Sequence, residues 1–592
     1  MAYKLEEKLS KVLYIDLTEQ KYEITDRPDL FDKYLGGAGV AAKLLEEECP
    51  KGMDPLGPDN PIILAVGPLT TLYPCMSKTV AMFKSPLTGN LGESHTGGRS
   101  ALAIRLAGYG AIVIKGAADK PIYLSIFNDK VEFKDASVLW GMRTTYSVGR
   151  VLREVEPGSG RRTIMRIGLA GERLVRFSNV AVETFRHFGR QGLGAVMGSK
   201  RLKALVIGGT GEIAIAKLKD YIKAYKELYD LVTKTPAMMK YRDYGTAVNV
   251  LALNTIGALP TRNLQATKFE YAENICGEKL AETLLSRRLA CSHCPIGCIH
   301  IAEVKVKFAP FHAYETLLVP YDYEPIYAMG SMLGIGDAIG MLRLLERAEA
   351  LGLDAMSAGV AMAWATEAFE RGIITANETN GLTLRWGDVD TYIKFLDNLV
   401  EMVNDFYRAL AMGTEHAASV YGGLDFALTF GGNEMPGYHV GPTTIVGFIV
   451  GARHSHLDNA GYSVDEKALK KPMNLEERVD RIVAEEQWRC VLSSLVACFF
   501  ARGVYTPDKV VKLLEIHGYS VTEDDLKKLG KEIHLMKYRF KLREGFSLER
   551  IRIPKRVFET PTPHGTLKEE DLRWMIRRFY EKAGILELAT SS

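Results

Sequence analysis

The chain has 592 residues, of which 47% are hydrophobic, and its 75 basic and 72 acidic residues leave a formal net charge of +3. This length predicts two to four domains with sizeable cores, and the interspersed charges exclude a nucleic-acid-binding signature. Because the sequence shows neither a signal-peptide pattern nor an apolar run of about 18 residues, we expect a cytoplasmic protein with no membrane partner.

Residues 1–213 are predicted to form a β-rich domain. Glycine-dense loops at 84–98 and 189–200 could bring backbone N–H groups close to a phosphate or a polar heterocycle, and ordinary turns are the alternative. Gly37-Ala-Gly39 fits part of a dinucleotide-binding pattern but follows no convincing strand, so we predict a tight turn there. Short apolar segments bounded by glycine and proline predict strands, which begin at Lys11, Lys21, Pro61, Ala111 and Ile122.

Three cysteines lie within eight residues in a C-x2-C-x3-C pattern, at Cys291, Cys294 and Cys298. Thiolate is a soft ligand that suits both zinc and iron–sulfur clusters. A [4Fe–4S] cluster needs four cysteines, and the fourth commonly comes from elsewhere in the chain. A structural zinc site completed by His293 or His300, or unrelated buried thiols, are the alternatives. The sequence has no second C-x2-C pair, so the spacing favours iron–sulfur.

From about residue 214 the apolar periodicity becomes helical, which predicts mainly α-helical domains over 214–429 and 430–592. Gly352 suits the end of one helix and Asp354 the start of the next. Residues 349–354 therefore lie at a helix end that could meet a ligand, and a simple N-cap role for Asp354 is the alternative. Helices are predicted from Leu218 and over 340–352, 358–371, 507–517 and 523–539.

A histidine-dense segment runs from Arg453 to Asp458, with His454 and His456 between them. Two histidines and a carboxylate could bind a metal or transfer protons near neutral pH. An exposed polar loop is the alternative.

Together these motifs resemble the aldehyde:ferredoxin oxidoreductase family of tungsten-dependent enzymes over nearly the whole chain. The resemblance implies an α+β fold, with an N-terminal β-sandwich-like cofactor-binding domain followed by two mainly α-helical domains. It depends on the ordered occurrence of Gly67-Pro-Leu-Thr70, Lys84-Ser-Pro-Leu-Thr-Gly89, Ala107-Gly-Tyr-Gly-Ala-Ile-Val113, Gly168-Leu-Ala-Gly-Glu172, Gly194-Ala-Val-Met-Gly-Ser-Lys200, the cysteine motif, Tyr323-Glu324, Leu333-Gly-Ile335 and Ala350-Leu-Gly-Leu-Asp354-Ala-Met-Ser357.

The resemblance also implies the cofactors: two pyranopterin dithiolenes that coordinate tungsten or molybdenum, Mg²⁺ bridging the pterin phosphates, and a [4Fe–4S] cluster. The implied cluster ligands are Cys291, Cys294, Cys298 and Cys498, with Cys490 as the competitor for the fourth position. Glu349 and Ser493 stand where the family has aspartates, and His95 stands where it usually has asparagine. The implied pterin contacts are Lys78, His95, Gly97, Arg186, His187, Gly189, Glu349, Gly352, Leu353, Asp354 and Ser493.

The implied reaction is oxidation of a small aldehyde to a carboxylate, with electrons passed through the cluster to ferredoxin. Glu324 is the implied general base and His456 the hydrogen-bond donor to the substrate, with His454 a weaker candidate. Two alternatives are a tungsten or molybdenum oxidoreductase or reductase of the same family with a non-aldehyde substrate, and a zinc-stabilised binding protein. A homodimer and a small electron-transfer subunit are candidate assemblies. The chain has only four glutamines, and 25% of its residues are charged. Depletion of thermolabile amides together with a high charged content is typical of thermophilic proteins.

Overall fold

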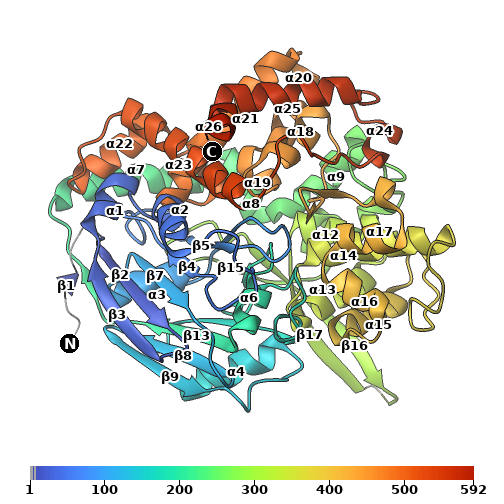
Figure 1. The fold of residues 1–592 in the computed structure, drawn as a ribbon, viewed down its shortest axis with the longest axis horizontal. Coiled ribbons are helices and arrows are strands. Elements are labelled where there is room, and N and C mark those ends of the chain that lie inside the picture. The colour runs from blue at the N-terminus through green and yellow to red at the C-terminus, as the bar shows by residue number, and fades with distance from the viewer. Residues whose placement is uncertain (1–3, 6–8, 312, 592) are drawn as a thin grey trace.

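The N-terminal part of the molecule is built on two six-stranded sheets (Figure 1). The computed structural model describes residues 4–5, 9–311 and 313–591. The first sheet has the strand order β3 (Lys21–Asp26), β2 (Lys11–Asp16), β7 (Ala111–Lys115), β4 (Ile62–Ala65), β5 (Thr79–Lys84) and β6 (Leu91–Thr96). The second has the order β12 (Arg186–Phe188), β11 (Val180–Val182), β10 (Thr163–Ile167), β13 (Leu202–Gly208), β8 (Ile122–Phe127) and β9 (Lys130–Asp135).

Helices cover these sheets, and strands that are buried on both faces carry almost no polar alternation. Every residue of β4 and β5 is buried, because α2 (Gly37–Glu48) packs on both strands. The edge strand β3 is mostly exposed and alternates charged with apolar residues. The other helices of this part are α1 (Pro28–Tyr34), α3 (Ser100–Ala107), α4 (Thr145–Val155), α5 (Leu169–Glu172) and α6 (Leu193–Ser199).

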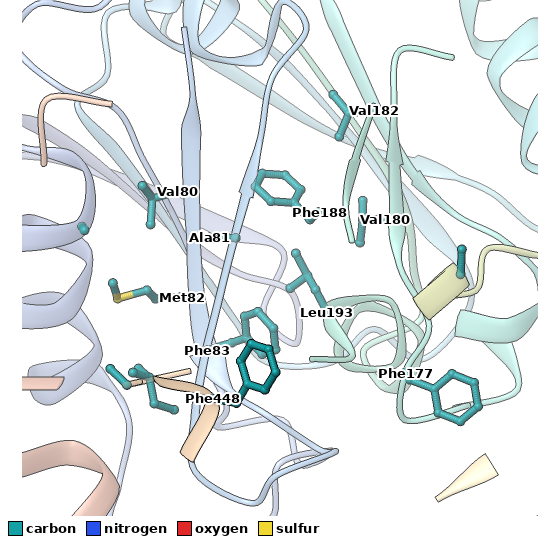
Figure 2. Close-up of a cluster of buried hydrophobic side chains, with 14 of the residues drawn as sticks. Val80, Ala81, Met82, Phe83, Phe177, Val180, Val182, Phe188, Leu193 and Phe448 are labelled. Carbon is teal, nitrogen blue, oxygen red and sulfur yellow. The ribbon is translucent and has the colours of Figure 1, made fainter. Parts of the chain in front are cut away.

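A hydrophobic core joins β5 to the second sheet. Figure 2 shows Ala81 and Phe83 of β5 facing Phe188 of β12 and Leu193 of α6, while Val80 and Met82 point to the opposite side of the strand. All of these side chains are at most 1% exposed. This packing fixes the edge strand β6 of the first sheet against the edge strand β12 of the second. β6 carries His95, and β12 carries Arg186.

The middle of the chain adds a three-stranded sheet and a group of helices. The cysteine motif lies between the first two strands of this sheet, which is made of β15 (Leu285–Leu289), β16 (Ile299–Ala309) and β17 (Ala313–Tyr321). The helices are α7 (Leu218–Lys234), α8 (Pro236–Asp243), α9 (Asn249–Ile256), α10 (Ala272–Ile275), α11 (Gly277–Thr283), α12 (Tyr323–Met329), α13 (Ala338–Leu351), α14 (Ala355–Glu370), α15 (Val389–Glu401), α16 (Asp405–Ala411) and α17 (Thr414–Tyr421).

The C-terminal helices, orange to red in Figure 1, lie across the top of the view and contact the first sheet's helical cover. The long helix α21 (Leu475–Ser494) packs against α2, and α23 (Glu523–Arg543) packs against both. The remaining helices are α18 (Pro442–Val450), α19 (His456–Asn459), α20 (Gly461–Lys470), α22 (Pro507–Ile516), α24 (Arg556–Glu559), α25 (Glu569–Ala583) and α26 (Ile585–Ser591).

The α+β architecture, with sheets first and helices afterwards, confirms the fold class expected from sequence. One local prediction is wrong: Gly37-Ala-Gly39 is the first turn of α2, not a tight turn. A Cβ on Gly37 would come closer than 3.0 Å to the Ser493 carbonyl oxygen, so the glycine lets α2 approach α21. In the described part of the chain no single helix is long and apolar enough to cross a membrane. Tyr323–Leu333 and Ala338–Leu351, a pair of helices bent by 115°, reach the required length and apolar composition only when taken together.

Candidate active site

Three distant segments meet at the cysteine motif. The loop 66–78, between β4 and β5, hydrogen-bonds to both of the others: Cys75 N–H donates to the His293 carbonyl (3.1 Å), and the Cys75 carbonyl accepts from Cys498 N–H (2.9 Å). Lys78 N–H donates to the Val496 carbonyl at 3.1 Å. Met76 and Ala497 also form an antiparallel bridge. The backbone therefore brings the motif and the segment after α21 together around the same loop.

The four cysteines assigned to a cluster form one electrostatic group with two cations. Burial raises the pKa of Cys298, and the neighbouring thiol of Cys498 raises it further. Burial also raises the pKa of Cys498, against the opposing charge of Lys78. Burial lowers the pKa of Arg186, but the interactions with Asp322 and with cysteines of the group outweigh burial and leave the pKa raised. We refer to Cys291, Cys294, Cys298 and Cys498 as the thiol group.

Gly97 lies inside this arrangement and has room for no side chain. A Cβ at Gly97 would come closer than 3.0 Å to Cys291 Sγ, and would lie 3.4 Å from Lys78 Nζ and 3.8 Å from Arg186 Nε. The predicted contact residues Lys78, Gly97 and Arg186 are therefore brought to the thiol group itself. Because Gly97 has no side chain, a cofactor could approach its backbone closely beside Lys78, Arg186 and Cys291.

Cys490, the competitor for the fourth ligand position, and His300, one of the two histidines of the zinc alternative, have other neighbours. Cys490 is buried in α21, where burial raises its pKa to about 12 and where its charged neighbours are Lys537 and Glu93. His300 Nε2 lies 2.9 Å from the Arg242 carbonyl. Among the described residues, no group of three or more His, Cys, Asp or Glu side chains is placed to hold a single metal ion.

A pocket of about 230 Å³ gathers most of the other predicted site residues. It lies where β6, β12, the start of α12 and the segment 453–457 converge. Of the residues predicted from sequence, it is lined by His95, Arg186, His187, Gly189, Glu324, Glu349 and His456.

Glu324 is held by two hydrogen-bond donors. The Tyr438 hydroxyl donates to its Oε1 at 2.8 Å, and His456 Nε2 lies 3.1 Å from the same oxygen. Burial raises the pKa of Glu324, but these contacts from His456 and Tyr438 outweigh burial and leave the pKa below its ordinary value. Because both contacts fall on Oε1, the second carboxylate oxygen of an ionised group is left to accept a proton.

Arg190, which sequence reasoning did not select, also lines the pocket. Its Nε donates to Asp354 Oδ2 at 3.1 Å, and its Nη2 donates to the Glu434 carbonyl at 2.7 Å. Its Nη1 is buried and has no hydrogen-bond partner within the described part of the chain, and the same holds for Arg186 Nε. Buried donors without partners are costly, so these two guanidinium groups fit a pocket that receives an anionic or strongly polar group.

The helix-end segment 349–354 contributes mainly through Glu349. Its Oε2 lies 2.5 Å from His187 Nε2, which ties α13 to β12. Asp354 caps α14, as the simpler alternative predicted, by accepting from Met356 N–H. A Cβ on Gly352 would come closer than 3.0 Å to Gly168, and Leu353 pairs with Ser178.

Ser493 is not brought to the pocket or to the thiol group. It is 3% exposed in α21, and its carbonyl faces Gly37. The structure therefore places the predicted pterin contacts unequally. His95, Arg186, His187, Gly189 and Glu349 line the pocket, and Lys78 and Gly97 lie at the thiol group. Gly352, Leu353, Asp354 and Ser493 do not line the pocket, although Asp354 accepts a hydrogen bond from the pocket residue Arg190.

The histidine-dense segment is buried, so the alternative of an exposed loop is wrong. His454 and His456 are 2% and 5% exposed. A buried charge without a partner is costly. Arg453 and Asp458 avoid this cost because they form an ion pair with each other at 2.6 Å. His454 faces away from Glu324, because its Nε2 lies 2.8 Å from Lys541 Nζ.

Two pocket-lining residues, Glu93 and His95, belong to a buried charge network. Glu93 lies 2.6 Å from Lys537 and 2.8 Å from His95 Nε2. Burial lowers the pKa of His95 to about 4, so its imidazole is neutral at physiological pH.

The sequence signals for the missed residues were weak. Arg190 stood within a glycine loop that was noticed for its glycines. Arg453, which also lines the pocket, stood within a segment that was noticed for its histidines. Tyr438 had no local signal, because its role depends on a contact with Glu324 across 114 positions of sequence.

Comparison with known proteins gives two family-model matches. Residues 12–209 match the N-terminal domain of aldehyde ferredoxin oxidoreductase, and residues 223–588 match domains 2 and 3. The chain is 31% identical to the tungsten-containing aldehyde ferredoxin oxidoreductase of Thermococcus kodakarensis, over 94% of this chain and 93% of the relative. It is equally identical to that of Pyrococcus furiosus, over 97% and 94%.

Two further similarities involve other reactions. The chain is 28% identical to the "aliphatic sulfonate oxidoreductase, WOR-like subunit" of Pyrococcus furiosus, over 97% of this chain and 94% of the relative. The structure also resembles the active-site complex BamBC of benzoyl coenzyme A reductase in complex with 1,5-dienoyl-CoA, with a TM-score of 0.82 and 22% identity. That likeness covers 99% of this chain and 95% of the solved chain, and it concerns the fold.

Proposed function

Because the chain belongs to the aldehyde ferredoxin oxidoreductase family, we propose that this oxidoreductase converts an aldehyde and water to a carboxylate and transfers the electrons to ferredoxin. The observation that carries this proposal is the Glu324–His456 pair in a pocket whose Arg186 also belongs to the electrostatic group of four thiols. Such an oxidation needs a proton acceptor and an electron-transfer centre near the substrate, and Arg186 connects the pocket that holds Glu324 to the thiol group.

The donor sets fit the family's cofactors. Four thiols match a [4Fe–4S] cluster held by Cys291, Cys294, Cys298 and Cys498. The residues that would hold a tungsten bis-pterin and its accompanying Mg²⁺ include Arg186 and Arg190, whose unpartnered donors are available to its polar groups. When bound, these groups supply the two-electron oxidation and the one-electron exit path. Molybdenum in place of tungsten is distinguished by elemental analysis.

The chain's own residues handle protons and orientation. Glu324 accepts the proton of water or of the hydrated aldehyde on its free carboxylate oxygen, because Tyr438 and His456 both contact Oε1. Ionisation of Glu324 is favoured by the same contacts, which keeps the base ready at neutral pH. His456 Nδ1, which is buried and has no partner among the described residues, is available for a hydrogen bond with the substrate oxygen.

Ferredoxin is the proposed acceptor, and either a second copy of the chain or a small electron-transfer subunit is the proposed assembly. A non-aldehyde substrate is the second candidate. It is favoured by the 28% identity to a relative named for aliphatic sulfonates and by the departures at His95 and Ser493 from the residues that the family resemblance implies.

The decisive experiment begins with tungsten, molybdenum, iron and zinc analysis of anaerobically purified protein, followed by viologen reduction with aliphatic, aromatic and sugar-derived aldehydes. Glu324→Gln should keep tungsten and iron but lose turnover about 10²- to 10⁴-fold, as expected for loss of a general base. Glu370→Gln, at an exposed position of α14, is the matched control.

Each proposal has its own contrary result. A metal-loaded Glu324→Gln protein with near wild-type turnover would remove Glu324 from the mechanism. Loaded wild-type protein that oxidises no aldehyde would favour the non-aldehyde substrate. Zinc alone, in cells supplied with tungsten and iron, would overturn the enzyme proposal.

A further inference from the structure

A fifth cysteine lies beside the thiol group. Cys75 is in the loop 66–78 and is 0% exposed. Its Sγ lies 3.7 Å from Cys294 Sγ, within hydrogen-bonding distance for sulfur. Neither the sequence motif nor the donor set of a four-cysteine cluster uses this residue.

The position of Cys75 is fixed by the two segments that carry the cluster ligands. Its N–H donates to the carbonyl of His293, next to Cys294, and its carbonyl accepts from the N–H of Cys498. Its backbone adopts a left-handed φ of 65°, which is uncommon for a residue other than glycine. The surrounding hydrogen bonds therefore hold the thiol in register with Cys294.

A protonated thiol in this place is a donor. The four other cysteines complete the ligand set of a cubane, while an S–H group can donate one weak hydrogen bond. We infer that Cys75 donates an S–H···S hydrogen bond to the Cys294 ligand and thereby raises the reduction potential of the cluster. The physical reason is that reduction adds negative charge to the cluster sulfurs, and a hydrogen bond to a sulfur is stronger when that sulfur is more negative.

This inference rests on the proposed cluster, and it makes Cys75 a positioning residue that acts through Cys294. The test uses the purified holoenzyme with two substitutions. Cys75→Ala removes the donor, and Cys75→Ser replaces it with a hydroxyl. Neither introduces a β-branched side chain, which the left-handed backbone would disfavour. Cys49→Ala, at another buried cysteine outside the thiol group, is the matched control.

The readouts are iron content and an anaerobic redox titration of the reduced cluster followed by electron paramagnetic resonance. We expect wild-type iron content in all three variants. In Cys75→Ala the reduced-to-oxidised ratio at a fixed potential should fall several-fold, where a tenfold fall corresponds to about 59 mV for a one-electron couple. Cys75→Ser and Cys49→Ala should titrate close to wild type. An exchangeable proton coupled to the cluster in electron–nuclear double resonance should disappear in Cys75→Ala.

Two results would overturn the inference. Cys75→Ala with full iron and an unchanged titration would mean that the thiol donates no bond that matters to the cluster. Loss of iron in both Cys75→Ala and Cys75→Ser would make Cys75 a ligand. Failure of the proposed function is seen separately, since wild-type protein would then lack iron before any substitution is made.

Discussion

Replacement of Gly97 by alanine tests the thiol group with a single methyl group. The new Cβ would come closer than 3.0 Å to Cys291 Sγ, and its retreat is limited by Lys78 Nζ at 3.4 Å and Arg186 Nε at 3.8 Å. Gly97 has no left-handed φ, so alanine accepts the backbone without strain and the effect is steric. Forcing an extra carbon into packed surroundings costs about 1–3 kcal/mol, and the Cys291 side chain must rotate to relieve it.

We therefore expect a Gly97→Ala protein that folds but holds well under half of the wild-type iron, measured per chain after anaerobic purification. Gly503→Ala is the matched control, because a Cβ there meets no atom within 4 Å and its backbone is not left-handed. If Gly97→Ala retained full iron and an unchanged visible spectrum, Cys291 would not be held beside Gly97 as a ligand, and the argument would fail.

Three further predictions concern buried ionisable groups. The pKa of His95 is lowered from 6.5 to about 4. The free energy of unfolding should therefore hold its full His95 contribution above pH 6.5 and fall by up to about 3 kcal/mol as the pH drops to about 4. Denaturant unfolding of His95→Asn, measured against pH, should lack this fall. Tyr438→Phe removes a donor to ionised Glu324, so the acid limb of the rate profile should move to higher pH, and an unmoved limb would contradict the contact's role. Glu367→Gln leaves Arg556 without its buried partner at 2.5 Å, and should destabilise the protein by about 3 kcal/mol in denaturant titrations; a change under 1 kcal/mol would show that solvent compensates.

The order of sheets and helices could be predicted because local signals agree with the fold. Gly352 ends α13 in the left-handed conformation and Asp354 caps α14, as the sequence indicated. The Gly37 segment was wrong because the reason for its glycines lies in another part of the chain: α21 passes so close that a side chain would collide with Ser493.

The site was harder to predict, because its geometry depends on pairs distant in sequence. Sequence reasoning left Cys490 as a competitor of Cys498, and the backbone contacts of residues 496–498 with the loop 66–78 bring Cys498 to the motif while Cys490 stays within α21. An exposed loop was one of two interpretations of the segment 453–458, and it failed because Arg453 and Asp458 neutralise each other in the interior. Arg190 could not be recognised without Asp354 and Glu434, which hold it.

The meeting of three distant segments at the thiol group has a consequence for biosynthesis. During synthesis, Cys291, Cys294 and Cys298 are made well before Cys498, and the loop 66–78 is made earlier still, long before its partner at 496–498. Since domains fold as they appear during synthesis, three reactive thiols stand ready without their fourth. The four thiols can therefore come together only after residue 498 has been synthesised and has reached the loop 66–78.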